Sequence, residues 1–392
     1  MTKENGAFYE RLAERGVTRR DFLKYCGGLA AMLGVSQSVA ATIAPAIANA
    51  ADSGLTPALW LNGGACTGCT ESMAQSTSPN VADVVLDILS MNYMETVMFA
   101  TGHAADEAMY ATAEEHEGNF VLIYEGSVME GWNGNALRIA GEPSTHQIDE
   151  IAPKAAACVA VGSCAVDGGW VKGAPNPAEA TGIQDYFTKK GIKTPVINLP
   201  GCPVNPEHIV AVVVDAVLLG TLADGSILNK LDKWGRPKYI FHATIHDSCP
   251  RRGHFENGEF VYEFGSEEEK KEYCLYAVGC KGPQTYNNCP TDRWNDKQSW
   301  CVEAGAPCIG CATYNWVDEN TPFLNRFRRI ALGEDGKSLP PTTIPAVATA
   351  AIAGVFVVHG FGMWKAGRVG NGAPTEDMKD WDRKRLAKKG GE

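Results

Sequence analysis

The chain has 392 residues, a formal net charge of −11 and 13 cysteines. The acidic balance argues against a nucleic acid or another polyanion as its partner, and the sequence contains no glycine-rich phosphate-binding loop. A chain of this length can bury large cores, so it does not need the dense disulfides of small exported proteins. The cysteines therefore favour metal chemistry, with disulfides as the alternative.

The first 50 residues have the pattern of a twin-arginine export signal. Arg19-Arg20 precedes an apolar stretch at 25–47, and small residues at 48–50 offer a cleavage site. The alternative is a short buried helix after a basic turn. We expect the mature chain to begin near Ala51, so that Cys26 is removed, and we expect the twin-arginine translocase to be a partner during export. This route carries folded proteins, so metal clusters can be inserted before export.

A second apolar stretch lies near the other end, at 343–364. It has no formal charge over about 22 residues, which is enough to cross a hydrocarbon core of about 30 Å. Basic residues outnumber acidic ones beyond it, as is typical of cytoplasmic segments. We expect a linker at 331–342, a single transmembrane helix at 343–364 and a cytoplasmic tail at 365–392, with the folded domains outside. The alternative is a buried Ala-rich helix.

Strand-like and helical runs alternate between residues 51 and about 230. Strands are expected at 58–61, 96–100, 120–124, 158–161 and 196–199, and helices at 81–89, 106–117, 183–190 and 209–219. Alternation of this kind predicts an α/β fold, a flavodoxin-like, doubly wound parallel sheet with helices on both faces. The carboxyl ends of the strands in such a sheet form the ligand crevice.

The pattern breaks between residues 231 and 330. This stretch has few long apolar runs and many Gly, Pro and Trp residues. It also holds eight of the twelve candidate metal ligands described next. We expect a second, loop-rich domain whose core consists partly of the metal groups that those ligands bind.

Eleven cysteines and one histidine of the exported chain fall into three groups of four. An iron–sulfur cube takes one soft ligand for each iron, usually a Cys thiolate and occasionally a His. Three iron–sulfur clusters would use all twelve. The first group is Cys66, Cys69, Cys164 and Cys202; the second is His246, Cys249, Cys274 and Cys280; the third is Cys289, Cys301, Cys308 and Cys311.

Cys158 is the one cysteine of the exported chain outside these groups. It competes with Cys164 for a place in the first group, since both lie on one strand-to-loop segment. Because Cys158 begins an apolar strand and free Cys is often simply buried, we expect it in the core.

These motifs together resemble the small subunit of membrane-bound [NiFe]-hydrogenases. The resemblance covers the export signal, both domains and the anchor, and seven motifs occur in the same order. In chain order they are Cys-Thr-Gly-Cys-Thr-Glu (66–71), Gly-Ser-Cys-Ala (162–165), Pro-Gly-Cys-Pro (200–203), His-x-x-Cys-Pro-Arg (246–251), Cys-x5-Cys-Lys-Gly-Pro (274–283), Tyr-Asn-Asn-Cys-Pro (286–290) and Pro-Cys-Ile-Gly-Cys (307–311).

The resemblance implies an electron relay in an oxidoreductase. In that family the Ni–Fe site belongs to a large subunit, and the small subunit transfers electrons away through clusters. The first group would hold a proximal [4Fe-4S] cluster against the large subunit, the third a medial cluster and the second a distal [4Fe-4S] cluster. An uptake hydrogenase of this kind would pass electrons to a membrane cytochrome b and quinone. A dimer of such heterodimers is also compatible with the resemblance.

Two positions bear on the kinds of cluster. Many relatives have Pro where this chain has Cys301, and their medial cluster is [3Fe-4S]. We expect a medial [4Fe-4S] cluster here; the alternative is a free Cys301 thiol beside a three-iron cluster. Imidazole at His246 removes a negative charge from the distal ligand set, which should raise that cluster's potential.

Oxygen-tolerant relatives carry two extra cysteines near the proximal cluster, at the positions of Gly68 and Gly169. We therefore expect no oxygen tolerance by that route. Ala65 stands where many relatives have Glu, a difference within the proximal pocket.

Three polar residues have open roles. Glu71 and Glu125 follow strand ends on the cluster side, where each is a candidate to face the large subunit, to relay protons or to be merely exposed. His359 lies in the apolar C-terminal segment, where it either contacts a membrane partner or bonds a neighbouring carbonyl.

Two other function classes compete with a hydrogenase small subunit. One is an exported iron–sulfur electron-transfer protein linked to a c-type cytochrome or another catalytic partner. The other is a non-enzymatic zinc or disulfide scaffold, which would lack brown colour and acid-labile sulfide.

Overall fold

The computed structural model describes residues 55–77, 80–84, 88–218, 221–324, 330–331, 338–339 and 343–365, with a few isolated positions nearer the ends. The predicted export signal and most of the predicted tail lie outside the described residues. The chain divides into two compact units, Met1–Phe327 and Arg328–Glu392. Within the first unit, the predicted boundary near residue 230 stays a prediction.

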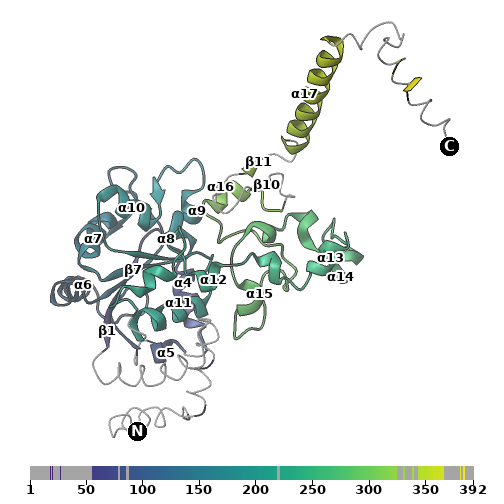
Figure 1. Cartoon of the computed structure of the whole chain (residues 1–392). Helices are drawn as coiled ribbons and strands as arrows, with labels where there is room; N and C mark the ends of the chain where they lie inside the picture. The colour runs from purple at the N-terminus through teal and green to yellow at the C-terminus, as the bar shows by residue number, and fades with distance from the viewer. Residues whose placement is uncertain are drawn as a thin grey trace. The chain divides into compact units, whose positions relative to one another are not determined.

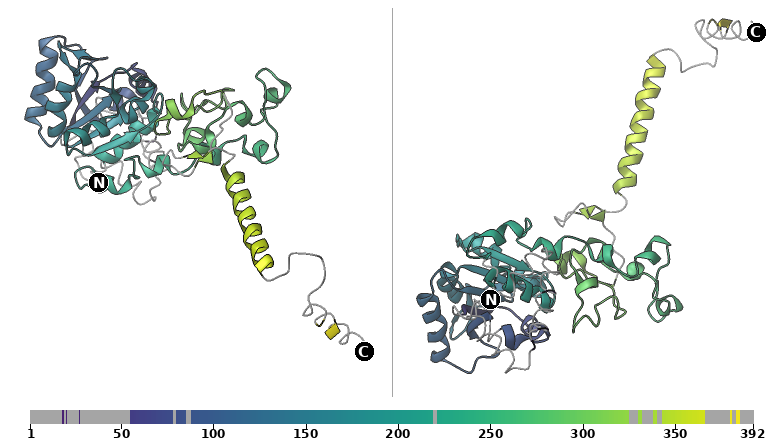
Figure 2. Two further views of the ribbon diagram at one scale, coloured as in Figure 1. Left: turned by 90° about the horizontal axis from the view of Figure 1, so that it is seen from above. Right: turned by 60° about the horizontal axis from the view of Figure 1, so that its bottom comes forward.

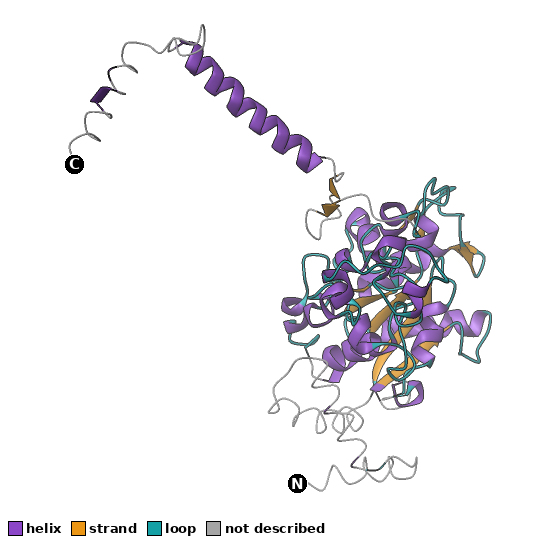
Figure 3. Cartoon of the chain, turned by 90° about the vertical axis from the view of Figure 1, so that its right-hand side faces the viewer, coloured by secondary structure: helices purple, strands orange, loops and turns teal. Residues whose placement is uncertain are grey.

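A five-stranded parallel sheet forms the centre of the first unit (Figure 3). Its strands stand in the order β2-β1-β3-β7-β9, and every neighbouring pair is parallel. This is the flavodoxin-like order, so the α/β fold predicted from the sequence is confirmed. The strands are β1 (Thr56–Asn62), β2 (Leu89–Met94), β3 (Val121–Glu125), β7 (Ala157–Val161) and β9 (Val196–Leu199).

Helices cover both faces of this sheet (Figure 1). Successive side chains of a strand point to opposite faces, so Leu59 and Leu61 join one buried core while Ala58 and Trp60 join the other. Strands buried on both faces read as continuous apolar runs, which is why they were recognisable in the sequence. The first core packs under α6 (His103–Glu115), α7 (Ser144–Ile151) and α10 (Ile183–Lys190); the second packs under α4 (Gly68–Ala74) and α11 (Pro206–Val213).

The strand predicted at 96–100 is wrong. The second strand is β2, which ends at Met94, and residues 95–100 form a turn and irregular backbone. An apolar run joins α5 (Val81–Asp83) to the start of β2, and this run conceals the boundary between helix and strand. Phe99 is fully exposed, so the apolar residues at 96–100 do not mark a buried strand.

Residues 232–324 consist of short helices, 3-10 turns and loops, which lie to one side of the sheet in both views of Figure 2. Their buried core is small and includes Cys280, Cys289 and Cys308 beside Trp300 and Leu275. The α-helices here are α12 (Lys238–Phe241), α13 (Arg252–Glu256), α14 (Glu267–Lys270), α15 (Cys289–Asp292) and α16 (Trp316–Asn320).

The second unit contains one long apolar helix, α17 (Thr343–Lys365). Its segment Val347–Lys365 has a mean hydropathy of 1.7, and none of that segment is buried within the described chain. By length and composition alone α17 can cross a membrane. His359 lies exposed on this helix. Two-residue strands at Ile330–Ala331 and Ser338–Leu339 pair before it.

Candidate iron–sulfur sites

The first group of cysteines gathers at the carboxyl edge of the sheet. Cys66 lies in the loop between β1 and α4, and Cys69 lies in the first turn of α4. Cys164 lies in α8 (Ser163–Asp167), after β7, and Cys202 follows β9. The main chain ties these loops together, since the Ser163 N–H donates to the Gly201 carbonyl at 2.8 Å. Burial, followed by the charges of Cys202 and Cys66, raises the pKa of Cys164 to about 12. Burial, followed by the charges of Glu125, Cys164 and Cys202, also raises the pKa of Cys69. The predicted four therefore lie near one another.

Glycines keep the space around these sulfurs clear. A Cβ on Gly162 would lie 2.4 Å from Cys69 Sγ, and one on Gly169 would lie 2.7 Å from Cys164 Sγ. Gly162 and Gly169 also have positive φ angles of 86° and 47°, a region that favours glycine. The donor set is soft and its surroundings leave room, so these residues fit a metal–sulfur group.

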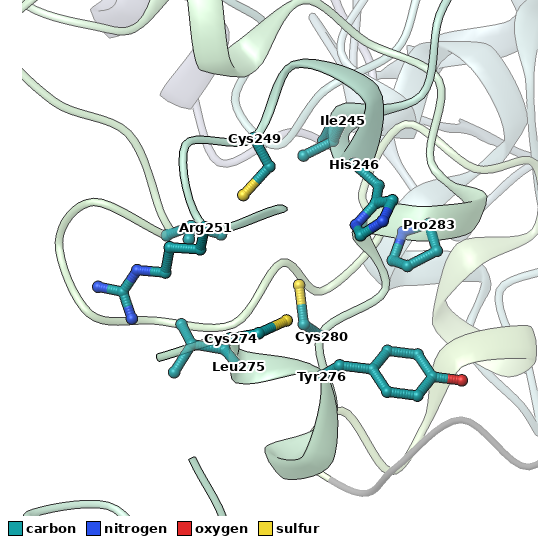
Figure 4. Close-up of a pocket in the computed structure, with 11 residues that line it drawn as sticks. Ile245, His246, Cys249, Arg251, Cys274, Leu275, Tyr276, Cys280 and Pro283 are labelled. Carbon is teal, nitrogen blue, oxygen red and sulfur yellow. The ribbon is translucent and has the colours of Figure 1, made fainter. Parts of the chain in front are cut away.

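The second group lines a small cavity among the short helices (Figure 4). The sulfurs of Cys249, Cys274 and Cys280 and the ring of His246 face a common space there, whereas the guanidinium of Arg251 points away from it. Burial and the nearby Arg252 charge lower the pKa of His246, which favours the neutral imidazole that binds metals.

The third group also converges. Burial, followed by the charges of Cys311 and Cys301, raises the pKa of Cys289 well above its usual range. Burial likewise raises the pKa of Cys308, which is close to Cys289 and Cys311. Cys289 begins α15, and the other three lie in loops.

The three groups form a continuous series in space. Cys311 of the third group is close enough to Cys202 of the first for their charges to interact, and Cys308 is similarly close to Cys280 of the second. The Ser163 hydroxyl donates to the Cys311 carbonyl and accepts from Gly201 N–H at 3.0 Å. On the other side, Lys281 N–H donates to the Cys308 carbonyl at 2.7 Å. The group that is last in the chain is thus in the middle.

Buried thiols of this kind give up their protons when a metal binds. Burial raises the pKa of Cys280 to about 11 and that of Cys311 to about 12, so a metal must displace the proton. Among the described residues, no three His, Cys, Asp or Glu side chains converge closely enough to hold a single metal ion. An iron–sulfur cluster requires a different geometry, because each ligand binds a different iron and the ligands need not converge on one point.

Several site residues could not be found from the sequence pattern. A partly buried contact joins the two halves of the first unit: His208 Nε2 lies 2.9 Å from Asp292 Oδ2, at the end of α15. Ser163 is another, since it joins the start of α8 to two loops far apart in the sequence, those of Gly201 and Cys311. Glu125, one of the three residues with open roles, is buried and does not face solvent, whereas Glu71 is exposed. Cys158 is fully buried within the core.

Comparisons with known proteins match both halves of the first unit. Residues 241–324 match a family model for the C-terminal part of the NiFe/NiFeSe hydrogenase small subunit, and residues 66–216 match one described as NADH ubiquinone oxidoreductase, 20 Kd subunit. The chain is 40% identical over 318 residues to the periplasmic [NiFe] hydrogenase small subunit of Solidesulfovibrio fructosivorans, which spans 81% of this chain and 96% of that protein.

Two further relatives extend the comparison. The quinone-reactive Ni/Fe-hydrogenase small chain of Wolinella succinogenes is 40% identical over 315 residues, 80% of this chain and 85% of that one. A solved structure of the [NiFeSe] hydrogenase from Desulfovibrio vulgaris Hildenborough superposes with a TM-score of 0.65 at 36% identity, covering 69% of this chain and 98% of the matched chain.

The fold and the cysteine groups define an iron–sulfur electron-transfer protein. The chain belongs to the small subunits of [NiFe]-hydrogenases. It is the component of a heterodimeric hydrogenase that pairs with a [NiFe]-hydrogenase large subunit, and small subunits of this family bind iron–sulfur clusters.

Proposed function

We propose that the chain relays electrons from H₂ oxidation in the large subunit to an acceptor in the membrane through three clusters. The first group would hold the proximal [4Fe-4S] cluster, the third the medial [4Fe-4S] cluster and the second the distal [4Fe-4S] cluster. When bound, such clusters take up and release single electrons. The observation that supports this proposal is that the three candidate groups lie in series, with Cys311 near Cys202 and Cys308 near Cys280.

The chain's own residues hold and separate the groups. The thiolates would each bind one iron, and the neutral His246 ring would complete the distal set. The hydrogen bond from Ser163 to the Cys311 carbonyl ties the third group to the first. The hydrogen bond from Lys281 N–H to the Cys308 carbonyl ties the third group to the second. Because the three sets share one hydrogen-bonded framework, their spacing is maintained by the fold.

The acceptor is proposed to be a membrane cytochrome b that passes electrons to quinone. The chain's similarity to a small chain named quinone-reactive supports this, as does the apolar helix α17. We place the first unit on the outer or periplasmic face after twin-arginine export, with α17 as a single membrane span and the tail in the cytoplasm.

Replacing His246 tests the direction of this relay. His246→Ala removes a distal ligand, so transfer to an external acceptor should fall at least tenfold while hydrogen–deuterium exchange at the large subunit stays nearly the same. His254→Ala is the matched control, because His254 pairs with Glu259 at 2.7 Å and is outside the four ligands. Equal loss of both activities in His246→Ala would show a folding role and contradict the assignment.

A further inference from the structure

Glu125 is a buried carboxylate at the carboxyl end of β3. Only 2% of the residue is exposed, and it is not one of the twelve candidate ligands. Its main chain is fixed by the parallel pairing of β3 with β1, in which it stands opposite Asn62. The Gly63 N–H then donates to the Glu125 carbonyl at 2.7 Å. The chain leaving β1 toward Cys66 is therefore bonded to Glu125 first, and Gly64 then exchanges main-chain hydrogen bonds with Ser127.

The side chain of Glu125 accepts four hydrogen bonds from that same region. Trp60 Nε1 donates at 3.2 Å, Cys69 N–H at 3.0 Å, Thr70 N–H at 3.1 Å and the Thr70 hydroxyl at 2.5 Å. All four groups donate and both carboxylate oxygens accept, which is the pattern of an ionised carboxylate. Hydrogen bonds to a charged acceptor are about twice as strong as neutral ones.

These bonds replace a missing helix cap. The first N–H groups of a helix have no partner within it. The N-cap residue of α4, Thr67, has a left-handed backbone and makes no side-chain cap hydrogen bond. Glu125 reaches over from β3 and satisfies the N–H groups of Cys69 and Thr70 instead. It therefore fixes the turn on which Cys66 and Cys69 stand.

We propose that Glu125 is the positioning residue of the proximal site: it holds the Cys66–Cys69 turn in its ligating conformation and places a fixed negative charge beside the cluster. This inference rests on the proposed function of the first cysteine group. A negative charge close to an electron acceptor opposes its reduction, so Glu125 keeps the proximal potential lower than a neutral residue would.

The test uses the anaerobically purified heterodimer. Glu125→Gln keeps the shape of the side chain. Its amide NH₂ would point at one of the four groups that donate to Glu125, and that group would lose its acceptor. We expect a positive shift of the proximal midpoint potential in a redox titration followed by electron paramagnetic resonance, and a loss of bound iron and sulfide. Glu125→Asp keeps the charge with a shorter reach, so its potential should stay close to that of the unmodified protein while iron is lost.

Asp215→Asn is the matched control. Asp215 is also a fully buried carboxylate, but within the described part of the chain its hydrogen bonds go to Lys230 and Thr221 rather than to the cysteine turn. We expect it to lower the unfolding temperature without moving the proximal potential. If the Glu125→Gln and Asp215→Asn heterodimers have the same proximal midpoint potential and the same iron content as each other, the positioning role of Glu125 is overturned.

Two further arms keep the inference testable. If Glu125→Gln does not fold, Thr70→Val removes one of the four donors and keeps the side-chain volume; it should lose more proximal iron than Asp215→Asn, and equal iron content would overturn the proposal. If the unmodified heterodimer shows no iron–sulfur signal at all, the proposed function itself fails.

Discussion

Single glycines decide whether the first cysteine group has room for the proposed proximal cluster. Gly162→Ala would add a Cβ 2.4 Å from Cys69 Sγ, whereas Cβ atoms in proteins essentially never come closer than 3.0 Å to another heavy atom. The alanine would also strain the backbone, whose φ is 86° at this position. We expect the variant to lose most of the proximal iron, as measured by metal and sulfide analysis of the heterodimer.

Gly191→Ala is the control that separates backbone strain from crowding of the cysteine sulfur. Gly191 also has a left-handed φ, 74°, but nothing lies within 4 Å of an added Cβ. Its replacement should cost about 1 kcal/mol of stability from backbone strain and leave the iron content unchanged. Equal iron loss in both variants would contradict a specific role for Gly162.

In the proposed relay, Cys301 decides the kind of medial cluster. Replacing it with Pro removes the fourth thiolate of the third group, so the oxidised medial cluster should become a paramagnetic three-iron form. Electron paramagnetic resonance of the oxidised heterodimer would show this as a new signal. An unchanged spectrum would mean that Cys301 is a free thiol and that the four-iron assignment is wrong.

At the scale of elements, α11 joins the sheet to the short helices and carries a pH-sensitive group. Asn205 caps α11 by accepting from Glu207 N–H at 2.9 Å, and it also donates to the Arg293 carbonyl. Burial, with Asp292 and Asp296 nearby, raises the pKa of Glu207 to about 7. In the unfolded chain Glu207 loses its proton at a lower pH.

Stability should therefore fall as the pH rises toward 7. Between the unfolded pKa and about pH 7 the folded state binds more protons at Glu207 than the unfolded state, and the stability decreases with rising pH. Glu207→Gln should remove this decrease and make the protein more stable than the original above pH 7. Thermal unfolding between pH 5 and pH 8 would test it, with exposed Glu256→Gln as the control; parallel curves for all three proteins would contradict the prediction.

The elements also show how far the sequence could be used. Strands buried on both faces, such as Ala157–Val161, were predictable because they are continuous apolar runs. The strand at Leu89–Met94 was not, since the mostly apolar sequence at 84–88 leads into it from α5 and hides where the strand begins. The role of Glu125 was not predictable either, because its four donors come from Trp60, Cys69 and Thr70, which only the folded sheet brings together.

The whole molecule separates its ligands from its apolar helix. All twelve candidate ligands lie in the unit Met1–Phe327, and α17 lies in the other unit. A chain ending at Phe327 should still pair with the large subunit and retain hydrogen–deuterium exchange, but should move from the membrane to the soluble fraction. Removing only residues 366–392 should leave it in the membrane. If the chain ending at Phe327 stayed in the membrane fraction, the proposal that α17 is the membrane anchor would be contradicted.

The spatial order of the three groups is a property of the whole fold. From the residues alone, the twelve candidate ligands could be sorted into groups, but the third group's place between the other two depends on contacts between Cys311 and Cys202 and between Cys308 and Cys280. Residues more than one hundred positions apart form the first of these contacts.

The most direct test of the relay is a spectrum of the native complex. The complex would be solubilised from membranes in mild detergent without oxygen and exposed to H₂, and the reduced-minus-oxidised visible spectrum recorded. We predict bleaching of iron–sulfur absorption together with b-type haem bands. No response to H₂, in a sample that an artificial reductant does reduce, would contradict the central claim that this chain carries electrons from H₂ to the membrane.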